Sequence, residues 1–349
     1  MKEIIESNED LWGLFTKKNE YFLEKPEQYR DYDFKGKKFN VLQPEISKFM
    51  VRSGFKVKYP DNKGFAVCLT HDVDEIYPPF SHMLLSSLYH VRDLNFRSLK
   101  REFLWRRIGK EYSPYWNFKE IMNLEEKYNA RSTFYFLATD QDIRRFRYNI
   151  EDLKKELASI VAKGWEVGLH GGYYAYNDLG KIKNEKERLE KVLGQKVTGY
   201  RNHYLRFKVP ETWEFLSKTG FKYDSTLGYT DMVGFRNGLC HPFKPFNLNN
   251  NREIDILEIP LNIMDGALFS FTASFEPAFK IAKNLIDTVQ KYKGVLTLLW
   301  HSNNFNCAFK ESWVRLYEDI LKYCYEKNAW LTSGEEVWRW WENGSCLDG

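Results

Sequence analysis

The sequence predicts an α/β protein built on a barrel-like parallel sheet. From Gly64 onward, short runs of apolar, β-favouring residues alternate about seven times with stretches of helical character, which is typical of repeated β/α units. Several of these strand-like runs end in acidic, basic or histidine residues. Parallel α/β folds keep their chemistry at the carboxyl ends of their strands. We therefore expect the functional site at that end of the sheet.

Residues 1–60 are expected to form a small, mostly helical N-terminal extension. They mix acids, bases and aromatic residues without one sustained period, and Pro26, Pro44 and Pro60 divide them into short pieces. The main domain is then expected over residues 61–343.

The clearest strand is the apolar run from Phe65 to Leu69, which leads into two closely spaced acids. Further strands are predicted at residues 131–137, 165–169, 197–200, 223–224, 254–261, 295–300 and 329–331. Helices are predicted at residues 116–128, 151–163, 181–193, 211–218, 277–293, 312–325 and 333–341. Gly194 and Gly220 suit the ends of two helices, and the acid-rich segment after Ser333 suits the start of the last one.

Composition limits the functional class. The chain has 349 residues, of which 43% are hydrophobic and 29% charged, so it can bury a full globular core. A net charge of +4 does not indicate nucleic acid as a partner. No stretch approaches the roughly 18 apolar residues of a spanning helix, and the first residues lack the apolar core of a signal peptide. Five scattered cysteines favour a reducing cytoplasm. The oligomeric state is not predicted.

An insertion at residues 76–113 separates the first strand from the first regular helix. Within residues 92–110, seven bases stand against two acids, and large apolar residues interleave at helical spacing. The simpler interpretation is a solvated helix whose apolar side packs on the barrel. The alternative is a basic lid that meets an anionic substrate, a lipid-linked substrate or an anionic membrane surface. The bases are Arg92, Arg97, Lys100, Arg101, Arg106, Arg107 and Lys110, and the apolar residues are Leu94, Phe96, Leu99, Phe103 and Leu104.

The candidate site combines acids and histidines from several strands. Asp72 and Asp74 stand one residue apart, and residues at i and i+2 of a strand face the same side. A carboxylate and neutral imidazoles bind a divalent ion that lowers the pKa of water, while a second carboxylate takes the proton. The pattern therefore predicts a mononuclear metal hydrolase. Later strand-like runs end in His170, in Arg201 with His203, and in His301.

Five motifs occur in a fixed order within residues 64–341. They are Thr70-His71-Asp72-Val73-Asp74, Leu169-His170-Gly171-Gly172-Tyr173-Tyr174, Arg201-Asn202-His203-Tyr204, Tyr223-Asp224-Ser225-Thr226-Leu227-Gly228-Tyr229 and Leu298-Leu299-Trp300-His301. This set resembles the polysaccharide deacetylases with the NodB homology domain, carbohydrate esterase family 4. It looks most like a divergent subgroup associated with surface-polysaccharide and O-antigen biosynthesis. The resemblance implies a distorted (β/α)7-type barrel and a metal-dependent hydrolysis of an N-acyl group.

The resemblance also implies roles for individual residues. Asp72 would be the general base, and Arg201 would hold it ionised. The backbone amide of Tyr204 would donate to the oxyanion of the tetrahedral intermediate. His301, in its protonated form, would give a proton to the leaving amine.

The orienting partner of His301 is not fixed by the resemblance. Asp224 in the fourth motif is one candidate. Asp265, which follows the strand predicted at residues 254–261, is an equal rival.

The metal ligands implied by the resemblance are Asp74 and His170, with zinc as the default ion. The sequence departs from the family pattern at two positions: Tyr174 stands where the second metal histidine is expected, and His203 stands where proline is usual. We hypothesise that the departures are linked and that His203 supplies the third ligand, because imidazole is a common zinc ligand and tyrosine a poor one. Alternatively, His203 only forms hydrogen bonds with the substrate or the core.

The sequence thus predicts a metal-dependent N-deacetylase that acts on an amino sugar of a surface-glycan precursor: a sugar nucleotide, a lipid-linked glycan or a nascent polysaccharide. The expected location is the cytoplasm, with peripheral contact at the inner face of the membrane as an option. One alternative is a deformylase or another amidohydrolase on the same fold, such as an enzyme for a small cyclic ureide. A second alternative is a catalytically silent carbohydrate-binding protein, against which the retention of Asp72, Arg201 and His301 argues.

Overall fold

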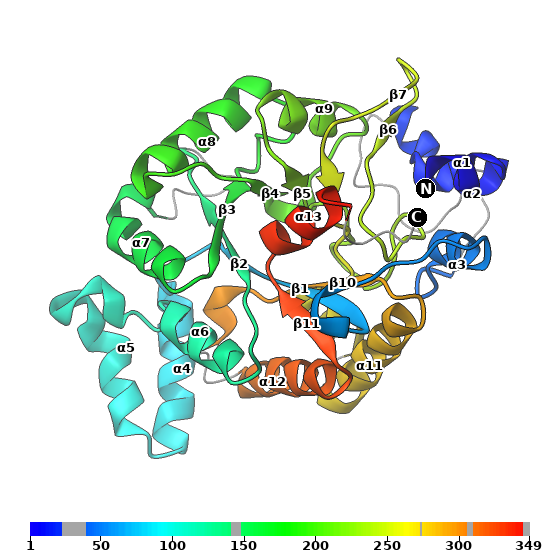
Figure 1. The fold of residues 1–349 in the computed structure, drawn as a ribbon. Helices are drawn as coiled ribbons and strands as arrows, with labels where there is room; N and C mark the ends of the chain where they lie inside the picture. The colour runs from blue at the N-terminus through cyan, green and yellow to red at the C-terminus, as the bar shows by residue number, and fades with distance from the viewer. Residues whose placement is uncertain (23–39, 141–147, 273, 306–309, 345–349) are drawn as a thin grey trace.

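A computed structural model of the chain describes residues 1–22, 40–140, 148–272, 274–305 and 310–344. These residues contain a nine-stranded, curled half-barrel sheet in which each strand pairing is parallel (Figure 1). The strands are β1 (Phe65–Val73), β2 (Thr133–Leu137), β3 (Glu166–Gly171), β4 (Gly199–Asn202), β5 (Tyr223–Asp224), β8 (Leu257–Glu258), β9 (Ile263–Met264), β10 (Val295–Leu299) and β11 (Ala329–Thr332). They follow the order β8-β5-β4-β3-β2-β1-β10-β9, and β11 pairs with the first half of β1. The predicted fold class is confirmed.

The central strands are buried on both faces. Each residue of β1, β2, β3 and β10 is buried, which explains why these strands appear in the sequence as continuous apolar runs. The strand predicted at residues 254–261 is shorter than expected: β8 ends at Glu258, and β9 forms separately after Pro260. Proline has no N–H group to donate to a sheet, so the pairing breaks there.

Helices surround the curled sheet (Figure 1). The seven helices expected in the main domain are present as α6 (Phe118–Glu126), α7 (Lys154–Ala162), α8 (Leu179–Leu193), α9 (Glu211–Lys218), α11 (Phe275–Lys291), α12 (Glu311–Glu326) and α13 (Gly334–Glu342). Helix α8 ends at Gly194, whose φ of +80° is the left-handed conformation that favours glycine. An additional helix, α10 (Asp265–Thr272), was not predicted, because its apolar run lacks a clear polar face.

The N-terminal segment contributes the short helices α1 (Lys2–Glu6), α2 (Glu9–Phe15) and α3 (Glu45–Arg52), and residues 23–39 lie outside the described part. It packs against the loop that contains the two-residue strands β6 (Phe246–Asn247) and β7 (Arg252–Glu253). The backbone amide of Ile46 donates to Gly238 O at 2.9 Å, and Arg236 Nη2 donates to the buried Glu20 Oε2 at 2.9 Å. These contacts fix the extension on the main domain. The boundary between residues 60 and 61 stays a prediction.

The insertion forms two antiparallel helices, α4 (Phe80–Arg92) and α5 (Phe96–Ile108), which stand beside the barrel (Figure 1). Its base is fixed at the carboxyl end of β1. The rings of Tyr77 and Trp105 stack with their centroids 5.4 Å apart, and Ser113 Oγ donates to Ile76 O at 2.7 Å. None of the helices in the described part of the chain is long and apolar enough to cross a bilayer.

Candidate metal centre

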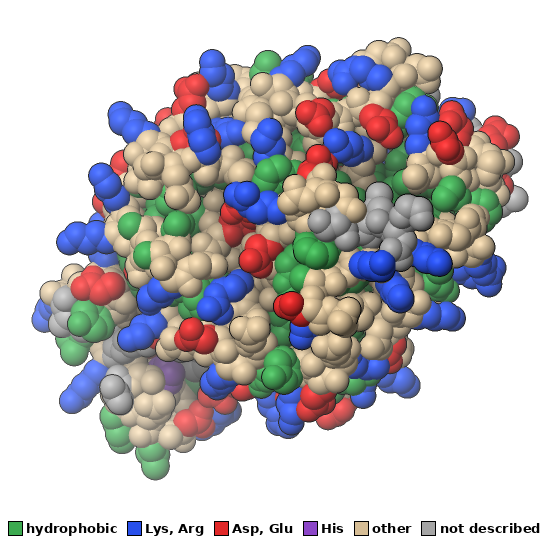
Figure 2. All heavy atoms as spheres, viewed as in Figure 1, with side chains coloured by type: hydrophobic (Ala, Val, Ile, Leu, Met, Phe, Trp, Pro, Cys, Tyr) green, Lys and Arg blue, Asp and Glu red, His purple; other side chains and the backbone are tan. Residues whose placement is uncertain are grey.

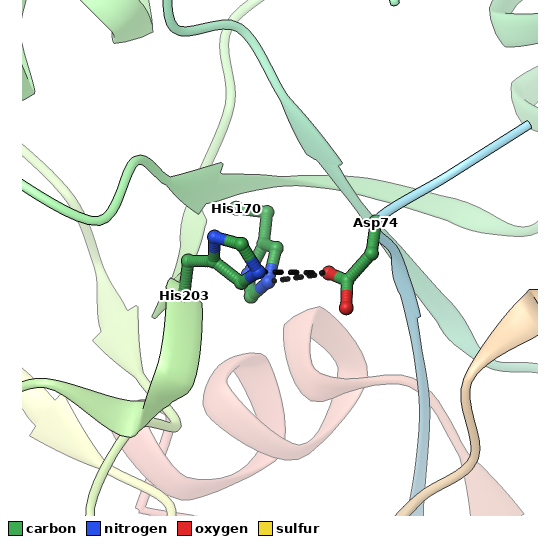
Figure 3. Close-up of side chains that lie close together, drawn as sticks. All are labelled: Asp74, His170 and His203. Carbon is green, nitrogen blue, oxygen red and sulfur yellow. Dashed lines mark ion pairs between the residues drawn. The ribbon is translucent and has the colours of Figure 1, made fainter. Parts of the chain in front are cut away.

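Three side chains converge at the carboxyl ends of β1, β3 and β4 (Figure 3). Asp74 directly follows β1, His170 lies near the end of β3, and His203 follows β4. One ligand atom from each lies within 4.8 Å of the other two. Nε2 of His170 is 3.2 Å from Asp74 Oδ1, and Nε2 of His203 is 3.6 Å from the same oxygen. Tyr174 is not part of this group and is 42% exposed.

The strand register explains this convergence. Asp72 pairs with Tyr135 of β2, so Asp74 reaches the level of Leu137 two residues further along. Leu137 pairs in turn with His170 of β3. Asp74 and His170 therefore lie at the same level along the sheet, although β2 separates β1 from β3.

The chemistry of these donor atoms fits a bound cation. Nδ1 of His170 lies 2.9 Å from the carbonyl oxygen of Arg201, which can only accept a hydrogen bond, so Nδ1 carries the hydrogen. In the neutral imidazole, Nε2 therefore has a free lone pair that can bind a metal ion. Asp74 Oδ1 is buried, and no donor in the described residues forms a hydrogen bond to it. A buried carboxylate oxygen that faces imidazole lone pairs is stabilised by a positive ion between them. Asp74, His170 and His203 thus form a fitting metal site.

Asp74 is ionised in this environment. Burial opposes its charge, but in the absence of a cation the positive charge of protonated His203 and His301 and the N–H groups of protonated His170 and His203 outweigh burial and hold the pKa of Asp74 well below its usual range. A bound cation would supply the same positive charge to the neutral rings. A permanently ionised carboxylate is the form that binds a metal ion.

The second acid, Asp72, is held by Arg201 inside the barrel. Both side chains are almost fully buried, and Arg201 Nη1 donates to Asp72 Oδ1 at 3.1 Å. Each nitrogen of the guanidinium donates: Nη1 also bonds Thr70 Oγ1 at 2.7 Å, while Nε and Nη2 bond the carbonyl and hydroxyl oxygens of Ser225 at 2.9 Å each. The other oxygen of Asp72 faces the metal site, 3.7 Å from Nε2 of His170.

His301 completes the rim of the site. Its Nε2 lies 3.8 Å from Asp74 Oδ2, and its Nδ1 lies 2.7 Å from Asp265 Oδ1. Asp265 Oδ2 accepts from the backbone amide of His301 at 2.8 Å and from Asn304 Nδ2 at 2.6 Å. Burial alone would lower the pKa of His301, but Asp265, Asp74 and Asp72 outweigh it and raise the pKa to about 10.

No family model and no curated protein sequence matches this chain. Solved structures do match. A Mycobacterium smegmatis structure described as a polysaccharide deacetylase superimposes with a TM-score of 0.56 at 18% identity, covering 83% of this chain and 94% of its own. The Puue allantoinase gives a TM-score of 0.55 at 15% identity, with 90% of this chain and 97% of its own covered. A Pseudomonas aeruginosa structure described as a polysaccharide deacetylase gives 0.55 at 16% identity, with 90% and 98% covered.

The chain has the polysaccharide deacetylase fold. At these identities the likeness concerns the fold and not the substrate, and allantoinase shares it.

Of the two acids proposed to orient His301, Asp265 is the one that contacts it. Asp224 lies on β5, where its Oδ1 accepts from the backbone amide and hydroxyl group of Thr226 at 3.2 and 2.6 Å. Its neighbour on the paired strand is Glu258. Burial raises the pKa of Asp224 to about 6, and burial together with the charge of Asp224 raises the pKa of Glu258 well above its usual range. Asp224 therefore contacts Thr226 and lies beside Glu258 rather than His301.

Tyr204 lies in a strained turn that follows β4 in this deacetylase-like barrel. Tyr204 and Leu205 have φ values of +59° and +51°, a left-handed conformation that costs non-glycine residues about 1 kcal/mol each. Such strain is typical of functional sites. Tyr204 is 46% exposed, and its ring makes a T-shaped contact with that of Tyr173 at 5.5 Å between centroids, while the rings of Tyr173 and Tyr174 lie 5.0 Å apart. These three rings form an aromatic rim beside His203.

Proposed function

We propose that this protein is a metal-dependent N-deacetylase that acts on an amino sugar of a surface-glycan precursor. The observation that carries the proposal is the convergence of Asp74, His170 and His203 within 4.8 Å, with Asp72 and His301 at the edge of the same site. This arrangement offers a cation site, a base and an acid together, which hydrolysis of an amide requires.

A divalent cation held by Asp74, His170 and His203, with zinc as the default, would supply Lewis acidity and lower the pKa of a water. The chain itself supplies the proton acceptor. Asp72 presents one carboxylate oxygen toward this site, while Arg201 binds the other oxygen. The charged guanidinium occupies one oxygen of Asp72, so the other oxygen is left to accept a proton from the attacking water.

Protonation of the leaving amine is assigned to His301, and stabilisation of the oxyanion is assigned to Tyr204. Asp265 fixes the His301 ring through Nδ1, so its protonated Nε2 points toward the site and can donate to the departing amine nitrogen. The turn at Tyr204 directs the backbone away from β4 next to His203. Its amide is assigned to the oxyanion of the tetrahedral intermediate.

A carbohydrate substrate is supported by the aromatic rim. Tyr174 and Tyr204 are exposed, and Tyr204 contacts the ring of His203 at 4.4 Å between centroids. Tyrosine rings with a polar tip suit the faces of sugars. A cytoplasmic precursor is supported by the thiols: among the described residues, Cys68, Cys240 and Cys324 are free and buried.

The test measures metal and product in the same preparations. We expect close to one equivalent of divalent metal by mass spectrometry, and acetate release from N-acetylated sugar nucleotides or lipid-linked glycans. Asp72→Asn should abolish turnover and retain metal, whereas Asp74→Ala should lose both. Equal metal loss in the two variants contradicts the assignment of Asp72 as base and Asp74 as ligand.

The same assay separates the alternatives on this fold. Formate release from N-formylated sugars indicates a deformylase, and turnover of a cyclic ureide such as allantoin indicates the chemistry named for one of the similar structures. A metal-free protein that binds glycans without releasing acetate refutes the enzyme proposal and indicates a carbohydrate-binding protein.

A further inference from the structure

The hairpin of α4 and α5 exposes an unusual number of large apolar side chains. Nine of the fourteen large hydrophobic residues that are exposed in the described part of the chain lie on it. Leu94, between the two helices, is 73% exposed, and Leu88 is 67% exposed. Figure 2 shows hydrophobic and basic side chains together over this hairpin, at the lower left. An exposed apolar surface of this size marks a binding surface for protein or membrane. The nine residues are Phe80, Leu84, Leu85, Leu88, Val91, Leu94, Phe96, Phe103 and Leu104.

Four of the five exposed apolar residues on α4 form one stripe, which recurs at i, i+4, i+8 and i+11 and therefore lies on one face of the helix. The opposite face is buried and carries His82, Met83 and Ser86. His82 Nδ1 is 2.9 Å from the hydroxyl oxygen of Tyr115, which fixes this face on the domain. The apolar stripe consequently points away from the barrel. Its members are Phe80, Leu84, Leu88 and Val91.

On α5 the exposed face alternates aromatic and basic residues. Phe96, Lys100, Phe103 and Arg107 recur at i, i+4, i+7 and i+11 and are all exposed. The buried face carries Trp105, which stacks on the hairpin base. The simpler interpretation of the insertion, in which its apolar side packs on the barrel, therefore fails for most of these side chains.

The charges on the hairpin favour an anionic partner. Lys100, Arg106 and Arg107 form no ion pair with any acid among the described residues, while Arg92 is neutralised by Asp93 at 2.7 Å. Lys110 pairs with an acid of the main domain, and the side chains of Arg97 and Arg101 lie outside the described part. Cations interleaved with phenylalanine and leucine on one helical surface suit the headgroup region of an anionic bilayer, where both groups are satisfied together.

We propose that the α4–α5 hairpin is a peripheral docking element for an anionic lipid bilayer. Leu88, Leu94 and Phe96 would enter the boundary between headgroups and acyl chains, and Lys100 and Arg107 would contact the headgroups. The base of the hairpin is fixed at Ile76 and Tyr77, two and three residues after Asp74, which follows β1. Docking would therefore hold the substrate-binding end of the barrel near the lipid surface. Docking itself does not depend on the proposed metal chemistry.

Sedimentation with vesicles tests this proposal. The full chain is mixed with vesicles of phosphatidylcholine alone or with about 30 mol% phosphatidylglycerol. We expect binding to the anionic vesicles only, weakened by added salt. Leu88→Asp should weaken binding roughly tenfold or more, and Arg107→Gln about fivefold. The matched control is Leu179→Asp, which changes an exposed leucine on α8 and should bind like the native protein.

Three outcomes would overturn the proposal: no vesicle binding by the native protein, equal binding to neutral and anionic vesicles, or equal weakening by Leu88→Asp and Leu179→Asp. A native dimer that becomes a monomer on Leu88→Asp, without vesicle binding, would assign the surface to a second copy of the chain. Circular dichroism verifies that each variant is folded. Asp74→Ala should bind vesicles normally, so failure of docking and failure of the proposed enzyme function are separate results.

Discussion

Replacement of Asp265 by asparagine should shift the pH dependence of turnover through His301. Asp265 lies 2.7 Å from Nδ1 of His301 and is the strongest of the charges that raise its pKa to about 10. Removal of an opposite charge at this distance lowers a pKa by about 1 to 3 units. A cation bound at Asp74 would offset the contribution of that carboxylate, so we assign the expected change to Asp265 alone.

The direction follows from which form of His301 is active. In the proposed reaction the protonated ring donates to the amine, so turnover should fall as the pH rises through the pKa of His301. In Asp265→Asn this pKa is lower, and the basic limb of the rate profile should therefore move about 1 to 3 pH units toward lower pH. Initial rates of acetate release measured from pH 5 to about pH 10.5 give the position of that limb.

The matched control is Asp224→Asn, which removes the rival carboxylate. Asp224 contacts Thr226 and pairs with Glu258 across β5 and β8, and these contacts do not include His301. The limb should therefore keep its position in this variant, whatever the rate. A basic limb that stays in place in Asp265→Asn, or that moves with Asp224→Asn instead, would refute the assignment. Metal content and a thermal melt exclude loss of the ion or of the fold as the cause.

Three further predictions concern the ligand set and the charges inside the barrel. His203→Ala should lower the affinity for the metal at least about 100-fold. The control His90→Gln, which changes a histidine on α4, should leave this affinity unchanged. Equal amounts of bound metal in the two variants would show that His203 is not a ligand. Arg201→Lys should lower the free energy of unfolding by about 3 kcal/mol in urea titrations, because lysine cannot reproduce the bonds to Asp72 and Ser225. Burial raises the pKa of Glu166 from 4.5 to about 7, so the folded protein holds this proton more tightly than the unfolded chain and loses stability as the pH rises between these two values. The free energy of unfolding of Glu166→Gln, measured relative to that of the native protein, should therefore rise by about 3 kcal/mol from pH 4.5 to pH 7. A difference that stays constant with pH would contradict this.

The sequence predicts the fold class well because of where the parallel strands lie. Strands such as β1 and β10 are buried on both faces, so their apolar runs stand out between helices with one apolar side. The acids and histidines at the ends of these runs also predict where the site is, since parallel strands share one carboxyl edge. The register then brings Asp74 and His170 to one level, as the strand-end pattern indicates.

The choice between Asp224 and Asp265 could not be made from the sequence, because it depends on strand order. Asp265 follows the two-residue strand β9, which pairs with β10 through Met264 and Leu299. This pairing places Asp265 beside the chain that leads into His301. Two residues are too few to show a strand pattern, and nothing in the linear sequence says that this segment neighbours β10.

The outer face of the hairpin shows a second limit of sequence patterns. The spacing of Phe96, Phe103 and Leu104 correctly indicates a helix with an apolar side, but periodicity does not say what covers that side. Trp105 instead packs inward, on Tyr77 at the base of the hairpin. The apolar side is left exposed, and this outcome is visible only when the packing of both helices is known.

The same interior that holds Asp72 also contains a chain of buried polar groups that contact one another. Arg201 lies over the ring of Tyr135 at 4.8 Å, the hydroxyl group of Tyr135 donates to that of Tyr223 at 3.1 Å, and Tyr223 donates to Glu166 at 2.7 Å. Glu166 in turn accepts from the backbone amide at the start of α13, at 2.8 Å. A Cβ atom at Gly199 would collide with the Tyr223 hydroxyl group, so glycine is required there. Each buried group thus contacts the next, from Asp72 at the carboxyl edge of the sheet to α13 at the amino edge. The position of Asp72 is therefore set by contacts that run through the whole barrel.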